Sequence, residues 1–395
     1  MKKLLSVVLA LLMLAVMLPV TAMAAGNPTK ENGVWKNVDP NNVQALLDGE
    51  YGPIDNTTIE LSAGDYSKIE FGRATEHKDS DTKYYLSGAV SDVDTIKKDI
   101  DDHPNGGAGK HEYVRNMSNV TIKAADGAAV TINGLVAFGG QVNSTKWYSR
   151  DFVADRDMSA TENNNISYWI GQNWSNITFK GLTFTGGVNI EAYGNDNTRI
   201  DNVKFENCKF SITDNPSETY CIRLNVDGNV AKANNLVVEK CEFTNGLTAV
   251  LTDGMPNVTV TDSTFSGLAR HAINPMMNYL PKAPGYGEIT VTGNTFKNMS
   301  NAEKGTILRM GDVGAGAVLT IKNNTATEGI TLANSVKVNS LADGITYNIS
   351  GNNWRENLKF SEAFKNIVDE PIPKPSTPIV IVPSTEETPK PAEDQ

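Results

Sequence analysis

The chain has 395 residues and a formal net charge of −11 at neutral pH. An acidic chain without a basic stripe does not favour nucleic acid as a partner, because phosphate binding needs clustered cations. Its three cysteines, Cys208, Cys221 and Cys241, are too few for a disulfide framework.

The first residues predict an export signal. Two lysines precede an apolar run that ends at Val20, and Ala22 and Ala24 occupy the small positions of a cleavage site. This arrangement is typical of a secretory signal peptide over residues 1–24. The alternative is an uncleaved membrane anchor, although a run of this length is marginal for crossing a bilayer. We therefore expect a secreted or cell-surface protein with no membrane span after signal cleavage.

Residues 25–52 are expected to form an N-terminal cap segment. Within it, residues 38–47 predict one short helix, with Asp39 as N-cap, Pro40 in the first turn and Gly49 after its end. A helix placed before the first strand is suited to cover the open end of a repetitive β-structure.

Seven later segments align with one another and predict a solenoid. They end at Phe184, Phe210, Phe243, Phe265, Phe296, Ala326 and Trp354, at intervals of 22 to 33 residues. A unit of this size, made of short alternating strands, buries its apolar face only by stacking on copies of itself. We expect the solenoid domain to span residues 53–365, with the five phenylalanines in one internal stack and Trp354 near its far end.

A break in the alternation recurs in each repeat and predicts a corner. Residues that tolerate left-handed backbone stand at or near it in most repeats, with Lys240 and Asp262 as departures; the others are Gly181, Asn207, Gly293, Asn323, Asn324, Asn352 and Asn353. Stacked asparagine amides can also bond one another between coils. Cys208 and Cys241 occupy the same place in successive repeats, which favours a buried, reduced apolar stack over a disulfide or metal pair.

Alternating strands, an Asn-rich corner, inward Val, Ile and Phe stacks and a leading helix resemble the pectate-lyase-like superfamily over about residues 37–360. The resemblance implies an all-β fold, a right-handed single-stranded parallel β-helix with an N-terminal capping helix and irregular loop insertions. It does not identify the chemistry, because this fold hosts lyases, hydrolases, esterases, adhesins and phage spikes.

Three insertions and a tail interrupt the regular pattern. The insertions span about residues 73–115, which hold His77, His103 and His111, residues 141–175, and residues 275–287. Residues 366–395 are rich in proline and acidic, which predicts a disordered tail or spacer.

The second insertion is a candidate sugar-binding loop, because aromatic rings stack on sugar faces. Its candidate binding residues are Trp147, Tyr148, Trp169 and Trp174. The alternative is that these rings pack the insertion onto the solenoid.

A second candidate site lies on the strands that follow the corners. If Leu224, Leu251 and Leu308 face the core, the outward set includes the candidate catalytic residues Glu191, Arg223 and Arg309. The same face would carry the candidate substrate-binding residues Asn225, Thr252 and Asn274 and the candidate calcium ligands Asp253 and Asp312. His271, beside a coil turn, is expected to be an incidental surface residue.

This face suits β-elimination from a uronate. In the family that the chain resembles, an Arg or Lys can serve as the base, and calcium neutralises the sugar carboxylate. The alternative is that these side chains form ordinary solvated ion pairs. The R-x-P-x-x-R run of pectate lyases and the G-H-G, N-x-D and D-D set of polygalacturonase-like hydrolases are absent from the sequence.

We expect an exported, monomeric protein that binds a polysaccharide or surface glycan, with calcium as the one cofactor under consideration. The first alternative is a polysaccharide lyase-like enzyme with an Arg base and calcium-assisted β-elimination. The second is a non-catalytic cell-surface adhesin.

Overall fold

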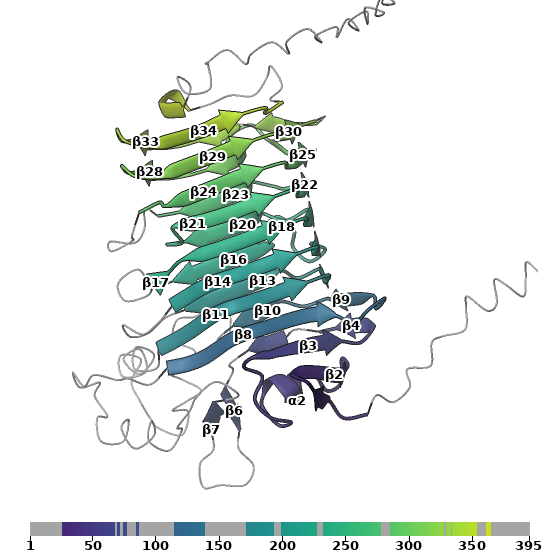
Figure 1. The fold of residues 1–395 in the computed structure, drawn as a ribbon. Helices are drawn as coiled ribbons and strands as arrows, with labels where there is room; N and C mark the ends of the chain where they lie inside the picture. The colour runs from purple at the N-terminus through teal and green to yellow at the C-terminus, as the bar shows by residue number, and fades with distance from the viewer. Residues whose placement is uncertain are drawn as a thin grey trace, which may run out of the picture.

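The computed structural model describes residues 26–67, 69–71, 74–76, 84–86, 114–138, 171–192, 199–226, 232–277, 285–327, 329–332, 334–353 and 361–364. Within these ranges the strands form one 12-stranded sheet, two 8-stranded sheets and three two-stranded pairs. Coils of the chain stack on one another from the N-terminal end to the C-terminal end, and their strands form the three large sheets (Figure 1).

The large sheets are called sheets 1, 2 and 3 in the order in which the chain visits them. Sheet 1 contains β1 (Thr29–Glu31), β2 (Val34–Val38), β3 (Thr57–Leu61), β8 (Val114–Ala124), β11 (Gly171–Lys180), β14 (Arg199–Glu206), β17 (Lys232–Ala233), β18 (Asn235–Glu239), β21 (Asn257–Thr261), β24 (Glu288–Thr292), β29 (Val318–Lys322) and β34 (Thr346–Ser350). Sheet 2 contains β4 (Gly64–Tyr66), β9 (Val130–Ile132), β12 (Thr183–Phe184), β15 (Lys209–Ser211), β19 (Glu242–Thr244), β22 (Thr264–Ser266), β25 (Thr295–Lys297) and β30 (Thr325–Ala326). Sheet 3 contains β5 (Ile69–Phe71), β10 (Val136–Phe138), β13 (Val188–Ala192), β16 (Ile222–Val226), β20 (Thr248–Asp253), β23 (His271–Met276), β27 (Thr306–Arg309) and β32 (Val336–Lys337).

The remaining strands form short pairs at the margins of the coils. They are the antiparallel β6 (Ala74–Glu76) and β7 (Tyr84–Leu86), and the parallel pairs β26 (Ser300–Asn301) with β31 (Thr331–Leu332) and β28 (Asp312–Val313) with β33 (Ser340–Leu341).

From β3 onward the chain visits the three sheets in turn, so a regular coil contributes one strand to each sheet. For example, β14, β15 and β16 are followed by β18, β19 and β20, and each strand pairs in parallel with its counterpart in the next coil. This all-β arrangement of repeating strand triplets is consistent with the expected solenoid and suggests a parallel β-helix. Within the described ranges, no helix has the length and apolar character that crossing a membrane requires.

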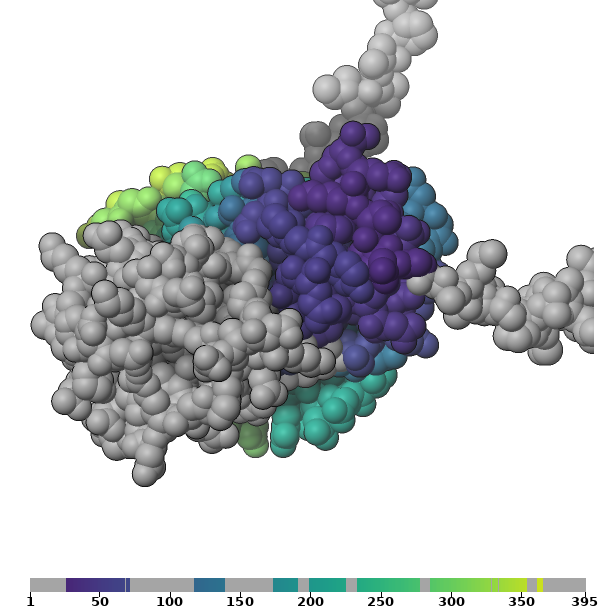
Figure 2. All heavy atoms as spheres, turned by 90° about the horizontal axis from the view of Figure 1, so that it is seen from below, coloured from purple at the N-terminus to yellow at the C-terminus, as the bar shows by residue number. Residues whose placement is uncertain are grey.

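The N-terminal helix is shorter than expected. Helix α2 spans Val43–Leu47 with Asn42 as its N-cap, so the prediction of a helix starting at Asp39 is wrong. The Asp39 carboxylate instead accepts hydrogen bonds from the amides of Asn41 and Asn42 at 2.8 and 3.1 Å, which holds a turn ahead of the helix. Seen from below, the N-terminal residues in purple form the near end of the molecule (Figure 2).

Helix α2 is tied to the first strand of sheet 3 by Gln44. The side-chain nitrogen of Gln44 donates to the backbone carbonyl oxygen of Glu70 at 2.9 Å. The side-chain oxygen of Gln44 accepts from the backbone amide of Glu70 at 3.0 Å. These two bonds satisfy backbone groups at the outermost strand, β5, where an open edge would otherwise remain. Strand β2 already belongs to sheet 1, which therefore begins inside the segment expected to be a cap.

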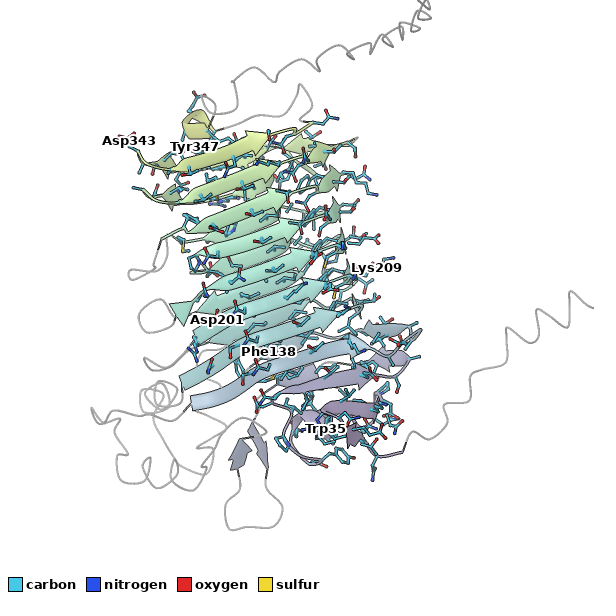
Figure 3. The ribbon with its side chains drawn as sticks, viewed as in Figure 1. Trp35, Phe138, Asp201, Lys209, Asp343 and Tyr347 are labelled. Atoms are coloured by element: carbon cyan, nitrogen blue, oxygen red, sulfur yellow. The ribbon has the colours of Figure 1, made fainter. Side chains whose placement is uncertain are left out.

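The interior contains the expected phenylalanine stack. Successive ring centroids lie 4.8, 4.9, 4.8 and 5.0 Å apart in the series Phe184, Phe210, Phe243, Phe265 and Phe296. This spacing matches the distance between neighbouring strands. Figure 3 shows Trp35 and Tyr347 near opposite ends of the solenoid, with Phe138 between them. Trp354 lies outside the described residues.

At the corner between sheets 1 and 2, one residue has a left-handed backbone conformation in each coil where such a corner was expected. The backbone φ is 52° at Asn207, 53° at Lys240 and 51° at Asp262, so the two departures adopt the same conformation as asparagine. In the last coil Gly351, with a φ of 68°, takes this position in place of the expected asparagine.

Asparagines also form a buried ladder just after this corner. The Asn294 amide donates to Asn324 at 3.1 Å, and the Asn324 amide donates to Asn352 at 2.9 Å. In earlier coils the same column holds Cys208 and Cys241, which are buried and free, and burial raises the pKa of the Cys208 thiol. The column therefore changes from apolar to amide as it rises through the solenoid.

A second asparagine ladder, at the start of the sheet 1 strands, was not expected. Asn56, Asn119, Asn176 and Asn202 have positive φ and bond one another through their amides at 2.6 to 3.0 Å. The sequence signal is an Asn immediately before a β-branched residue, which is Thr57, Val120, Ile177 or Val203 in these four coils. Reading that signal would have placed this corner as well.

Candidate functional site

Sheet 3 places Arg223 and Arg309 in one register column on its outer face. Arg223 pairs with Leu251 and Leu251 with Asn274, while the pairing of Ile273 with Leu308 sets Arg309 beside Asn274. Three strand steps separate the two arginines, which corresponds to about 14 Å. Their shared column agrees with the sequence prediction, but the distance is too long for one sugar ring to contact both.

The expected orientation of strand β20 is wrong by one residue. Thr252, expected to face outward, pairs with the core residue Leu224 and is fully buried, whereas Leu251 pairs with Arg223. Residues 249–251 of this strand are all apolar, so alternation alone does not determine which side faces the core. The neighbouring strand determines it, because Ile222 pairs with Val250.

A cleft of about 400 Å³ opens beside Arg223, where three successive coils enter sheet 3. Its floor is built from the short turns at residues 133–135 and 186–188. The connection at residues 212–221 between β15 and β16 is longer, and part of it forms a wall. A Cβ at Gly186 would lie 2.5 Å from the carbonyl carbon of Gly134, so the two turns stack this closely because residue 186 has no side chain.

The long connection folds back on itself and presents two carboxylates. The amides of Glu218 and Thr219 donate to the carbonyl oxygen of Asn215 at 2.9 and 3.0 Å, and the Thr219 hydroxyl donates to the carbonyl oxygen of Asp214 at 3.0 Å. Asp214 and Glu218 are exposed and line the cleft. Sequence reasoning missed both, although this connection between two strands is longer than those of the preceding coils.

Arg223 and Asn189 supply the inner polar groups of the cleft. The Arg223 guanidinium lies over the Tyr220 ring, 5.7 Å from its centroid, so the aromatic face supports the cation. Asn189 pairs with Arg223 in the sheet and is only 3% exposed, yet its side-chain oxygen has no hydrogen-bond partner. A buried acceptor of this kind favours a ligand that brings a donor.

Among the described side chains of the expected site, those of Asp253 and Asn274 do not line this cleft. Glu191 pairs with Asn225, and Asn225 pairs with Asp253. The core column that contains Leu224 separates these three residues from the column of Arg223. The side chains of Glu191 and Asn225 lie outside the part of the chain that the structure describes. Burial raises the pKa of the Asp253 carboxyl, and the positive charge of Arg223 opposes that shift. Asn274 is 7% exposed, and its side-chain oxygen has no hydrogen-bond partner.

The two expected calcium ligands belong to different sheets. Asp253 ends β20 in sheet 3, whereas Asp312 begins β28 and accepts a hydrogen bond from the Ser340 hydroxyl at 2.6 Å. Among the residues that the structure describes, no three His, Cys, Asp or Glu side chains gather as a metal site.

One aromatic candidate is corrected, and three cannot be placed. Trp174 was expected in a loop but lies in β11, fully buried, with its ring 5.7 Å from that of Phe138. Strand β11 starts at Gly171, earlier than expected, so Trp174 occupies an inward position of the strand. Trp147, Tyr148 and Trp169 lie outside the described residues.

His271 is also corrected, because it is a buried strand residue and not a surface one. It begins β23, is 1% exposed, and contacts the Thr306 hydroxyl at 2.9 Å and the Arg309 guanidinium at 3.4 Å. Burial and the neighbouring cations lower its pKa to about 3, so the ring is neutral at ordinary pH.

Comparisons of the chain with protein-family models, with curated proteins and with solved structures gave no match.

Proposed function

We propose that this chain is an exported polysaccharide-binding protein whose sugar site is the cleft beside Arg223. We also propose that the solenoid is a right-handed parallel β-helix of the pectate-lyase-like kind, with α2 as its cap. The observation that carries the functional proposal is the convergence in one cleft of an arginine supported by a tyrosine ring and a buried amide oxygen without a partner.

The chemistry of the cleft fits a sugar better than an apolar ligand. Hydroxyl groups would donate to the Asn189 oxygen and to the carboxylates of Asp214 and Glu218. The Tyr220 ring offers an apolar face with a polar tip, which is the usual surface on which sugars pack. Arg223 would hold the carboxylate of an acidic sugar through two parallel hydrogen bonds, which favours uronate-containing glycans.

The export signal predicted over residues 1–24 supports the same proposal, because extracellular polysaccharides would then be the accessible ligands. The protein would act as a monomer at the cell surface or in the medium.

Binding of defined oligosaccharides tests the proposal. Oligogalacturonate, oligoalginate and neutral xylan and cellulose oligomers would be titrated into the protein by calorimetry, with and without calcium. Arg223→Ala is expected to weaken binding of an acidic oligomer about tenfold or more, because a charge-assisted contact to the ligand is lost. Arg199→Ala, at the exposed start of β14 in sheet 1, is the matched control and should bind as wild type does.

Two results would overturn or refine the proposal. If no acidic or neutral oligomer binds, the cleft is not a sugar site. If binding is followed by new ultraviolet absorbance from unsaturated products, the protein is a lyase and binding is only its first step.

A further inference from the structure

A second polar site lies higher on sheet 3, around His271, and is separate from the cleft. Arginine only donates hydrogen bonds, so the His271 Nε2 atom must accept from Arg309. The proton of the neutral ring then sits on Nδ1 and is donated to the Thr306 hydroxyl oxygen. His271 therefore fixes the position of Arg309 without neutralising its charge.

Three cations surround this histidine. Arg270 precedes it, Arg309 contacts it from β27, and Lys337 pairs with Arg309 from β32. All three charges lie close enough to lower the pKa of His271. Strand pairing sets Lys337 beside Arg309, and the Arg309 guanidinium contacts His271, the residue that follows Arg270. The Thr306 amide also donates to the carbonyl oxygen of Arg270 at 3.0 Å, which joins Arg270 to the strand that carries Arg309.

No carboxylate among the described residues forms an ion pair with Arg270, Arg309 or Lys337. Sheet 1 differs in this respect, because several of its outward lysines form ion pairs with carboxylates of the same or a neighbouring coil. Lys123 contacts Glu60 at 2.8 Å, and Lys204 contacts both Glu206 and Glu239 at 3.0 Å. In a chain with a net charge of −11, three clustered cations without such partners stand out.

The Arg270 side chain adds a hydrogen-bonding requirement. Its Nε atom is shielded from solvent and has no hydrogen-bond partner. Leaving a buried charged donor unsatisfied costs free energy, which an acceptor placed against it would recover. The acceptor that also offsets three positive charges is an oxyanion.

We propose that Arg270, Arg309 and Lys337 form a binding site for a small oxyanion, such as a carboxylate, sulfate or phosphate group. Arg270 and Arg309 present planar donor forks, and Lys337 adds a mobile point charge from the exposed side. Arg309 lies about 14 Å from Arg223, so this site is distinct from the cleft and functions independently of it.

The imidazole resonances of His271 provide a direct readout. Sodium sulfate, sodium phosphate and sodium galacturonate would be titrated separately into ¹⁵N-labelled protein, with sodium chloride holding the ionic strength constant. His271→Asn assigns the signals. We expect a saturable shift of the His271 ring nitrogens, and the anion that saturates at the lowest concentration identifies the oxyanion class.

Variants separate a built site from general screening. Arg309→Gln and Lys337→Gln are each expected to weaken binding about tenfold, because each removes a charge-assisted contact. Arg309→Gln removes a contact of the His271 ring and therefore changes the His271 signal by itself. For this variant the loss of anion binding is measured by calorimetry. Lys297→Gln, on the exposed side of β25, is the matched control for Lys337→Gln and should leave binding unchanged. Arg223→Gln should also leave it unchanged, whether or not the cleft binds sugar.

The proposal is overturned if none of the three anions shifts His271 beyond chloride. It is equally overturned if the shift is the same in Lys337→Gln as in wild type. Lys337 is exposed, so its replacement tests the site even if Arg309→Gln disturbs folding.

Discussion

His271 shows how one buried side chain links the stability of the solenoid to pH. Its pKa is about 3 in the folded protein, against an ordinary value of 6.5, because burial and three nearby cations disfavour the charged ring. As pH falls from 6.5 towards 3, the unfolded chain takes up a proton that the folded chain refuses. The free energy of unfolding therefore falls by up to about 1.4 kcal/mol per pH unit in this window.

We predict that His271→Asn flattens this acid dependence. Urea unfolding at a series of pH values would show a slope smaller by about 1 kcal/mol per pH unit between pH 6 and 4, since asparagine does not titrate. The variant should be less stable than wild type at neutral pH, because Thr306 and Arg309 lose their shared partner. Paired carboxylates such as Glu206, with a pKa of about 2, contribute equally in both proteins and cancel in the comparison.

Thr306→Val is the matched control for this measurement. It removes the hydroxyl that accepts from His271 but keeps the titrating ring, so it should lose stability while keeping the steep slope. If His271→Asn and wild type have the same slope, the histidine is not held neutral as inferred.

At the scale of strands, a column of stacked phenylalanine rings packs neighbouring coils against one another. Phe243 lies between Phe210 and Phe265, with ring centroids 4.9 and 4.8 Å away, and is fully buried. We predict that Phe243→Ala lowers the free energy of unfolding by about 3–5 kcal/mol, because it loses apolar burial and leaves a cavity between two rigid coils. Urea unfolding followed by circular dichroism would measure it.

Phe243→Leu provides the comparison, since it retains most of the buried volume and should cost clearly less. A loss for Phe243→Ala below about 1 kcal/mol would mean that neighbouring coils collapse into the space. The solenoid would then be more deformable than its stacked rings indicate.

Sequence reasoning predicted the strands and corners because they follow local rules. Alternation identified the inward Phe210 and Phe243, and the left-handed preference of Asn207 and similar residues identified the corner. The same rules failed at β20, where consecutive apolar residues satisfy either orientation and the neighbouring strand decides. Local pattern and register therefore carry different information.

The candidate site was harder to predict because it depends on contacts between coils. Arg223 was identified as an outward charge, but Tyr220 and Asn189 reach it only through folding of the long connection and pairing with the previous coil. His271 was misjudged for the same reason, since its burial comes from strands β20 and β27 on either side. No local pattern reports such neighbours.

At the scale of the whole molecule, stability should be close to a sum over coils and their interfaces. One coil, residues 235–256, contains β18, β19 and β20, and its first residue pairs with Asn257 at the start of the next coil. Removing it would bring Phe210 against Phe265 and Ile222 against Ile273, which are in the same columns.

We predict that deletion of residues 235–256 gives a folded, shorter solenoid. Its circular dichroism should remain that of a β-protein with one cooperative thermal transition, at a lower temperature because one coil and one interface are lost. Arg223 and Arg309 would then be two strand steps apart, about 10 Å, and the deletion keeps every residue that lines the cleft as well as Arg270, His271 and Lys337. Deletion of residues 235–261 is the control, because it also removes β21 and leaves one coil without a strand in sheet 1. If the two deletions are equally unfolded, the coils are not interchangeable units and the solenoid depends on contacts specific to each one.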